Sequence, residues 1–198
     1  ILYFYAADLA RAPDGKWWVL DDRCESPSGA GFALQNRIAM SRMLPDVFHD
    51  CRVERLAPYF IAVQEQLRRL APPRDRRPRI VLLSHQAGSA NYFEDAFLAR
   101  YLGYTLAEAG DLAVRQNQLF LKSLAGLSPV DVLLRRPNSE NCDPRELTGT
   151  SSSGVAGLMQ SIRTRNVAVA NGLGSGLVES PAFMAYLPRL AEELLGEP

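Results

Sequence analysis

The sequence predicts an α/β fold with a mainly parallel sheet, preceded by a β-hairpin and helices. After residue 79, short aliphatic runs typical of strands buried on both faces alternate with segments of helical periodicity. At the start of the chain, strand-forming residues flank a Pro-Asp-Gly turn signal. A chain of 198 residues that is 47% apolar and 22% charged suits a folded domain with a core and argues against disorder.

The first third of the chain is expected to contain the hairpin and two helices. The predicted arms of the hairpin are residues 1–6 and 16–21. A helix is predicted over residues 32–44, where apolar side chains fall partly on one face. A second helix is predicted over residues 58–71, because apolar residues recur every three or four positions and a proline occupies the first turn.

The next segment, residues 72–79, combines proline with charge, which is typical of a linker. We therefore predict two domains, residues 1–73 and residues 74–198. Together with Arg68 and Arg69 this segment is the densest basic cluster of the chain. A solvated linker is the simpler interpretation of the cluster, and a phosphate or nucleic-acid patch is the alternative.

A βαβ unit is predicted over residues 79–107, with its first strand at residues 79–84. In the helix that follows, Asn91 and Glu94 have the spacing of a capping box, and Gly103 suits the helix end. The remaining elements are a hairpin over residues 113–121, a buried strand at 130–134, a helix at 155–162 after a serine-rich entry at 150–154, a strand at 167–170 and a helix at 181–195.

Charge and cysteine content exclude several classes of protein. The 22 basic and 22 acidic residues give zero net charge, so neither a nucleic-acid nor a membrane partner is expected. No apolar run approaches the ~20 residues that cross a bilayer, and three widely spaced cysteines suggest reduced thiols in the cytoplasm. The two histidines, His49 and His85, have no metal-ligand spacing, and a nucleophile motif is absent.

Two loops follow predicted strands and are candidates for ligand contact. Residues 88–91 precede a helix N-terminus, so they form either a structural turn or a site for an anion or carboxylate, with Ser89 and Asn91 as binding residues. The glycine-rich residues 171–176 either turn tightly or allow a ligand to approach the backbone. Neither loop carries a known nucleotide-binding glycine pattern.

Three aspartates stand on the arms of the first hairpin. Asp8, Asp21 and Asp22 offer the hard oxygen ligands that Mg²⁺ prefers, and carboxylates on adjacent strands repel one another without a compensating cation. The alternative is that they are solvent-facing strand ends that pair with Arg11 or Arg23.

Several short sequence blocks are distributed along almost the whole chain. They include Asp-Leu-Ala-Arg at residues 8–11, Trp-Trp-Val-Leu-Asp-Asp at 17–22, Ala-Asn-Tyr-Phe-Glu at 90–94, Gly-Val-Ala-Gly-Leu at 154–158 and Gly-Ser-Gly at 174–176. In these blocks the sequence resembles the circularly permuted ATP-grasp proteins, a bacterial family similar to glutathionylspermidine synthetases.

The resemblance implies a fragment of an ATP-dependent carboxylate–amine ligase that uses Mg²⁺ and an acyl phosphate. It implies a Rossmann-like pre-ATP-grasp domain in residues 74–198 that helps to bind the acceptor, a small molecule or peptide. The hairpin would be the tail of the ATP-grasp fold, completed by the remainder of the parent chain. The nucleotide pocket would then lie outside this chain, so the fragment alone is expected to be inactive.

The resemblance also suggests roles for individual residues. The loop with Ser26, Ser28 and Gly29 corresponds to a substrate-side loop, and Asp8 and Asp21 fall on metal-ligand positions. Arg23 falls where relatives carry an asparagine, and a guanidinium cannot ligate a metal. Three interpretations stay open: Asp22 replaces the missing ligand, Arg23 contacts phosphate, or the metal site is lost. The last would make the protein a catalytically degenerate relative that binds peptides or proteins.

Overall fold

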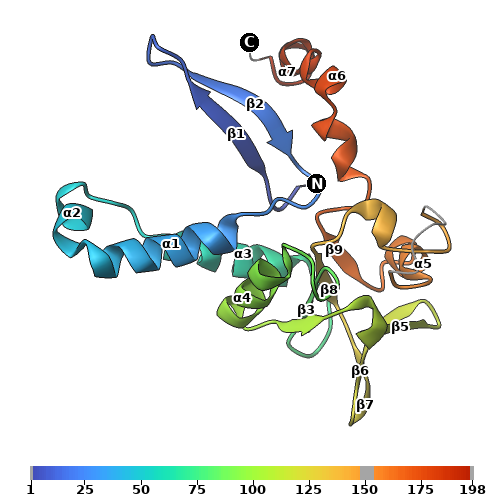
Figure 1. The fold of residues 1–198 in the computed structure, drawn as a ribbon. Helices are drawn as coiled ribbons and strands as arrows, with labels where there is room; N and C mark the ends of the chain where they lie inside the picture. Colours follow the sequence, from blue (N-terminus) through green and yellow to red (C-terminus); the bar gives the residue numbers. More distant parts are fainter. Residues whose placement is uncertain (1, 148–153, 197–198) are drawn as a thin grey trace.

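A four-stranded parallel sheet forms the centre of the molecule in the computed structural model, which describes residues 2–147 and 154–196. Its strands lie in the order β4-β3-β8-β9 (Figure 1). They are β3 (Ile80–Leu83), β4 (Thr105–Ala107), β8 (Val132–Arg135) and β9 (Ala168–Ala170). All residues of β3 and β8 are buried, as the aliphatic runs predicted. The α/β class with a mainly parallel sheet is confirmed.

The strand order creates a switch point between β3 and β8. From β3 the chain passes through α4 (Tyr92–Leu102) to β4 on one side, and β8 and β9 extend the sheet on the other side. The predicted βαβ unit is confirmed, because β3 and β4 pair in parallel with Val81 opposite Thr105. Open parallel sheets bind ligands beyond the carboxyl ends of their strands at such a point.

Helices cover one face of the sheet. The helices α1 (Ala30–Met43), α3 (Ala57–Leu70) and α4 pack on this face. Because neighbouring strand residues point to opposite faces, Ile80 and Leu82 belong to this core cluster. Helices from before residue 73 share this cluster with strands from after it. The predicted domain boundary at residue 73 stays a prediction.

The other face packs against α5 (Leu158–Arg163) and a small antiparallel sheet. That sheet consists of β5 (Leu112–Arg115), β6 (Gln118–Ser123) and β7 (Gly126–Pro129). The hairpin predicted here is confirmed, and β7 is an additional strand. The turn between β5 and β6 has positive φ angles at Gln116 and Asn117, as tight hairpin turns require.

One helical prediction needs correction, and one helix was not predicted. The sequence pattern did not reveal α2 (Pro45–Asp50), which begins at a proline directly after α1. The single helix predicted over residues 181–195 is divided into α6 (Pro181–Met184) and α7 (Leu187–Leu195), after a 3₁₀ turn η3 (Ser175–Glu179). The division follows from Pro188, which has no N–H to donate to the preceding turn. The serine-rich entry predicted at residues 150–154 lies, except for Gly154, outside the described residues.

The predicted N-terminal hairpin is confirmed as β1 (Ala6–Arg11) and β2 (Trp17–Arg23), although its first arm begins only at Ala6. It projects away from the parallel sheet (Figure 1). Several large apolar side chains on it are exposed: Leu9, Trp17, Trp18, Val19 and Leu20. Within the described residues, no helix is long and apolar enough to cross a membrane.

The basic segment after α3 is bound to the body of the protein. Asp131, which is 1% exposed, accepts two hydrogen bonds of 2.7 and 2.9 Å from Arg76. The Nε atom of Arg74 lies 2.9 Å from the same carboxylate. Arg74 and Arg76 therefore compensate a buried carboxylate, although both arginines stay exposed to solvent as the linker interpretation predicted.

Candidate functional site

The candidate site lies at the carboxyl edge of the parallel sheet, where the segment after β2 meets the loops after β8 and β9. Asn171 at the end of β9 joins these parts. Its side-chain oxygen accepts hydrogen bonds from the backbone N–H groups of Tyr3 and Phe4, at 2.8 and 2.9 Å. Its amide nitrogen donates to the carbonyl oxygens of Phe4 and Cys24, at 2.7 and 2.6 Å. One buried side chain thus fixes both ends of the N-terminal hairpin to the sheet.

Arg135, the last residue of β8, organises the glycine-rich loop. Its guanidinium donates to the carbonyl oxygens of Asn171 at 2.9 Å, Gly172 at 3.0 Å and Pro137 at 2.9 Å. Burial lowers the pKa of Arg135, and the nearby carboxylate of Glu25 opposes this shift. The tight turn of residues 171–176 therefore wraps an arginine of the protein itself, which favours the structural interpretation of this loop.

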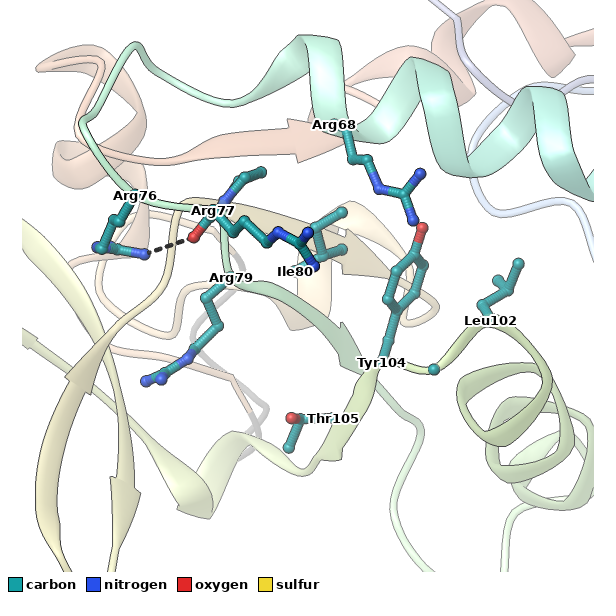
Figure 2. A pocket seen from close by; sticks show the side chains of 10 residues that line it. Arg68, Arg76, Arg77, Arg79, Ile80, Leu102, Tyr104 and Thr105 are labelled. Carbon is teal, nitrogen blue, oxygen red and sulfur yellow. Dashed lines mark hydrogen bonds between the residues drawn. The ribbon is translucent and has the colours of Figure 1, made fainter.

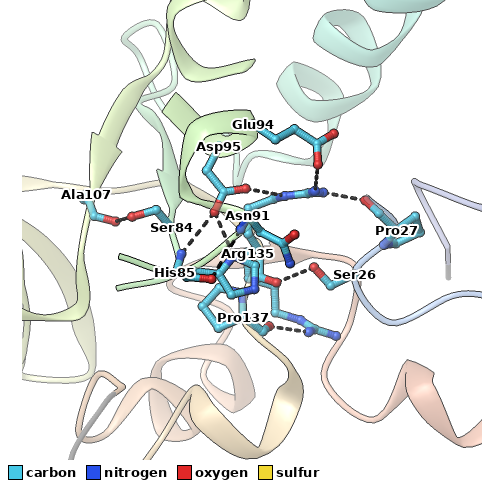
Figure 3. Close-up of polar contacts among 12 residues, drawn as sticks. Ser26, Pro27, Ser84, His85, Asn91, Glu94, Asp95, Ala107, Arg135 and Pro137 are labelled. Carbon is cyan, nitrogen blue, oxygen red and sulfur yellow. Dashed lines mark hydrogen bonds and ion pairs between the residues drawn. The ribbon is translucent and has the colours of Figure 1, made fainter. Parts of the chain in front are cut away.

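The next residue, Arg136, holds the segment before α1 in place (Figure 3). It donates to Asp95 at 2.9 Å and to the carbonyl oxygen of Pro27 at 2.6 Å, and it lies 3.4 Å from Glu94. Both carboxylates are fully buried, so the arginine supplies the charge compensation that they require. The pair of arginines after β8 therefore connects the sheet to the loop around Pro27.

The capping box predicted at Asn91 and Glu94 is wrong. Asn91 makes no side-chain cap, and Glu94 instead accepts hydrogen bonds from the backbone N–H groups of Gly29 and Gly31, at 2.8 and 2.9 Å. A Cβ atom on Gly31 would lie 2.7 Å from the Glu94 side chain, so only glycine allows this approach. The spacing signal was correct for a helix start, but a contact across 63 residues uses the carboxylate.

A polar cavity of about 400 Å³ lies beside this network. Four of the residues predicted from the sequence line it, namely Asp8, Arg23, Ser26 and Ser28. The other lining residues are Ala6, Glu25, Pro27, Asn138 and Glu179. The cavity therefore brings together the hairpin, the predicted substrate-side loop and the loop after β8.

Sequence reasoning missed the two glutamates of this cavity. Glu179 accepts hydrogen bonds from the backbone N–H groups of Cys24 and Glu25, at 2.5 and 2.6 Å. Glu25 accepts one from the N–H of Ser139, at 2.6 Å. Both carboxylates therefore organise the walls of the cavity, and no local pattern indicates contacts between positions more than 100 residues apart.

The hairpin aspartates are only partly brought together. Asp8 and Asp21 are directly opposite one another in the strand register, and Arg23 lies 2.9 and 3.2 Å from their carboxylates. The hydrogen bond and charge of Asp8 raise the pKa of Arg23, and Asp21 adds to the effect. Asp22 points elsewhere and accepts a hydrogen bond of 2.5 Å from Tyr5, which raises the pKa of Tyr5 to about 12.

This arrangement does not fit a magnesium ion. The guanidinium of Arg23 occupies the place between the two facing carboxylates, and Asp22 belongs to a different contact. Among the described residues, no group of three or more histidine, cysteine or acidic side chains is placed to hold a metal ion. The metal-ligand roles of Asp8, Asp21 and Asp22 stay predictions, and they require Arg23 to release the carboxylates.

Of the other residues predicted to bind substrate, some line the cavity and others are used in contacts within the protein. The Ser26 hydroxyl donates to the carbonyl oxygen of Arg136, and the Gly29 N–H is used by Glu94. Ser28 lines the cavity. Ser89 and Asn91 do not line it; the Ser89 hydroxyl accepts a hydrogen bond of 3.4 Å from the N–H of Asn91.

A second, smaller cavity of about 230 Å³ lies at the same edge, and His85 and Ser84 are among its lining residues. The Nδ1 atom of His85 lies 2.8 Å from Asp95, the carboxylate that also binds Arg136 (Figure 3). No local sequence pattern indicates this histidine–aspartate pair, because it depends on the packing of α4 against the end of β3.

Comparisons with known proteins give a consistent result. The family model described as circularly permuted ATP-grasp type 2 matches residues 1–198. An uncharacterized protein of Mycobacterium tuberculosis is 38% identical over 196 residues, which are 99% of this chain and 22% of that protein. An uncharacterized protein of Synechocystis is 36% identical over 190 residues, 96% of this chain and 40% of that protein. A third uncharacterized protein, from Mycobacterium leprae, is 34% identical over 190 residues, which are 96% of this chain and 34% of that protein. The chain thus spans about a fifth to two fifths of the length of these relatives.

Proposed function

The chain belongs to the circularly permuted ATP-grasp type 2 family, and from this premise we propose that it is the acceptor-binding part of an ATP-dependent carboxylate–amine ligase. Membership of this family suggests an ATP-dependent ligase, and such enzymes generally use ATP and Mg²⁺. The kinship with glutathionylspermidine synthetases stays a prediction. In the proposed reaction a carboxylate oxygen accepts the terminal phosphoryl group and ADP leaves. An amine then attacks the acyl carbon, phosphate leaves and the amine loses a proton.

The observation that carries the proposal is the composition of the 400 Å³ cavity. It combines one cation, Arg23, which pairs with the lining carboxylate of Asp8, with hydroxyl and amide side chains from Ser28 and Asn138 and with the carboxylates of Glu25 and Glu179. A cation and hydroxyl donors suit the carboxylate end of an amino acid or peptide, and the glutamates suit its amine end. The proposed acceptor is therefore a small molecule or peptide that carries both charges.

The rigid walls of the cavity support this role. Arg136, Glu94 and Asn171 fix the loop that contains Ser28, so its donors are held in place before a substrate arrives. Preorganised polar groups bind a charged ligand without the cost of ordering them at that moment. The remainder of the parent protein would supply the nucleotide pocket. We propose the cytoplasm as its location, because all three cysteines of the chain are free and ATP is a substrate.

The test uses the full-length protein with ATP, Mg²⁺ and a panel of amino acids and peptides, and it measures ADP and phosphate release. Ser28→Ala and Asn138→Ala are expected to raise KM for the acceptor by roughly tenfold each, with KM for ATP unchanged. The matched control is Ser123→Ala, an exposed serine on β6. Absence of turnover with every acceptor would refute the ligase, and an unchanged acceptor KM in both variants would refute the assignment of the cavity.

A second candidate function rests on the position of Arg23. Because this residue pairs with both Asp8 and Asp21, the protein would be a catalytically degenerate relative that binds a peptide or protein in the same cavity. Arg23→Asn should then create Mg²⁺-dependent nucleotide affinity that the natural protein lacks, measured by calorimetry on the full-length protein. Tight Mg²⁺-dependent ATP binding by the natural protein would exclude this function and favour the ligase.

A further inference from the structure

A basic cavity lies at the amino end of the parallel sheet, at the opposite edge from the candidate site. Its volume is about 890 Å³. It is lined by the end of α3, by the basic segment after it, by the first residue of β3 and by the turn between α4 and β4 (Figure 2). Among the residues that the structure describes, the lining includes four arginines, Arg68, Arg76, Arg77 and Arg79, and no acidic residue.

Three of these arginines lack a compensating charge. Arg76 is bound to Asp131, as described above. For Arg68, Arg77 and Arg79, the described part of the chain contains no carboxylate within ion-pair distance. Guanidinium groups that share a cavity repel one another, so an anion between them would relieve that repulsion.

The backbone that carries these arginines is fixed in advance. Asp131 holds Arg74 and Arg76, and the same carboxylate accepts a hydrogen bond of 2.7 Å from the backbone N–H of Arg79. In the sheet register, the carbonyl oxygen of Arg79 also accepts hydrogen bonds from the N–H groups of Asp131 and Val132. Arg77 and Arg79 therefore extend from an ordered segment, and a ligand would not have to order it.

A second, independent observation comes from Tyr104. Its hydroxyl is buried at this cavity, and it has no hydrogen-bond partner among the described residues. A buried hydroxyl normally finds a partner, because burial without one costs free energy. Figure 2 shows the Tyr104 hydroxyl directed toward the Arg68 guanidinium. Burial raises the pKa of Tyr104, and the positive charge of Arg68 opposes that shift. A bound oxyanion would accept hydrogen bonds both from the phenol O–H and from the guanidinium N–H groups.

We propose that this cavity binds a small soluble molecule that carries phosphate groups, with Arg68, Arg77, Arg79 and Tyr104 as its contacts. Guanidinium forks match phosphate oxygens in geometry, and more than one phosphate suits three unpaired cations. The apolar side chains of Ile80 and Leu102 in the lining would contact the rest of the ligand. The site is separate from the acceptor cavity, so the proposal does not depend on the ligase function.

Calorimetric titration of the full-length protein with inorganic pyrophosphate tests the site. Arg77→Gln combined with Arg79→Gln should weaken binding by roughly tenfold or more, and Tyr104→Phe by about fivefold. The matched control combines Arg115→Gln with Lys122→Gln, two exposed cations on the small antiparallel sheet, and should change affinity by less than about twofold.

The outcomes separate this site from other binding modes. If both double variants weaken binding equally, the effect is general electrostatic attraction and the proposal fails. If neither does, pyrophosphate binds elsewhere, for example at a nucleotide pocket, and the proposal also fails. A third arm mixes the protein with vesicles of phosphatidic acid: sedimentation that pyrophosphate does not displace would replace the soluble ligand by a lipid headgroup. Full ligase turnover by the Arg77 and Arg79 double variant would support a site distinct from the acceptor cavity.

Discussion

Replacement of Asn171 by alanine should detach the N-terminal hairpin from the sheet. Asn171 is 2% exposed and makes four hydrogen bonds, to Tyr3, Phe4 and Cys24. At a net ~1 kcal/mol for each bond, the side chain contributes about 4 kcal/mol to this attachment. Water would reach some of the exposed backbone groups in the variant, so we expect a loss of about 2–4 kcal/mol.

Local hydrogen exchange on the full-length protein measures this loss directly. Amides in peptides that cover residues 3–4 and 24–31 should exchange roughly 30-fold to 1,000-fold faster in Asn171→Ala, whereas those in α5 should be unchanged. A global unfolding curve would be less informative, because a protein with several domains does not unfold in one step.

The isosteric variant Asn171→Asp serves as a second measurement. A carboxylate still accepts from the two N–H groups, but it cannot donate to the carbonyl oxygens of Phe4 and Cys24, which then face a negative charge. At neutral pH this variant should lose at least as much protection as the alanine variant, and acidification should restore part of it when the carboxyl group gains a proton. Wild-type exchange in both variants would refute the argument that Asn171 holds the hairpin.

Two further predictions concern titratable groups. The hydrogen bond to Asp22 raises the pKa of Tyr5 to about 12, so the folded state favours the protonated phenol. Its contribution to stability should be complete below pH ~10 and lost between pH ~10 and ~12. When hydrogen exchange follows the protection of the hairpin, Tyr5→Phe should show no such transition in that range. Of the three free cysteines, Cys51 is exposed and Cys24 is buried, and burial raises the pKa of Cys142 to about 11. Iodoacetamide at pH 8 should therefore label Cys51 first. Peptide mapping that finds Cys142 labelled equally fast would contradict the buried position of this thiol.

The parallel sheet was the part of the fold that sequence reasoning predicted best. Runs such as residues 80–83 are apolar at every position, and that pattern has a local cause, since a strand with helices or sheets on both faces has no solvent side. In contrast, β7 has the sequence Gly-Leu-Ser-Pro, which contains few strand formers. It exists because β6 offers an edge for it to pair with, and no local pattern contains that information.

The site was predicted less completely, for an identifiable reason. Asp21 and Asp22 are adjacent on one strand, so their side chains point to opposite faces and could not both join Asp8. Which of the two faces Asp8 depends on the irregular register between Asp8 and Leu9, which the sequence does not reveal. The contacts of Glu94 and Asp131 were missed because their partners are distant in the chain.

The exposed hairpin gives the protein an optical property. The chain has two tryptophans, Trp17 and Trp18, which are neighbours on β2 and are 66% and 59% exposed. Because neighbouring strand residues point to opposite faces, the two indoles lie on the two exposed faces of the hairpin. Indole emission from this chain therefore reports on the hairpin only and is insensitive to the packing of the parallel sheet. A shift of that emission to shorter wavelength would record the moment at which another surface covers β1 and β2, without any label being attached.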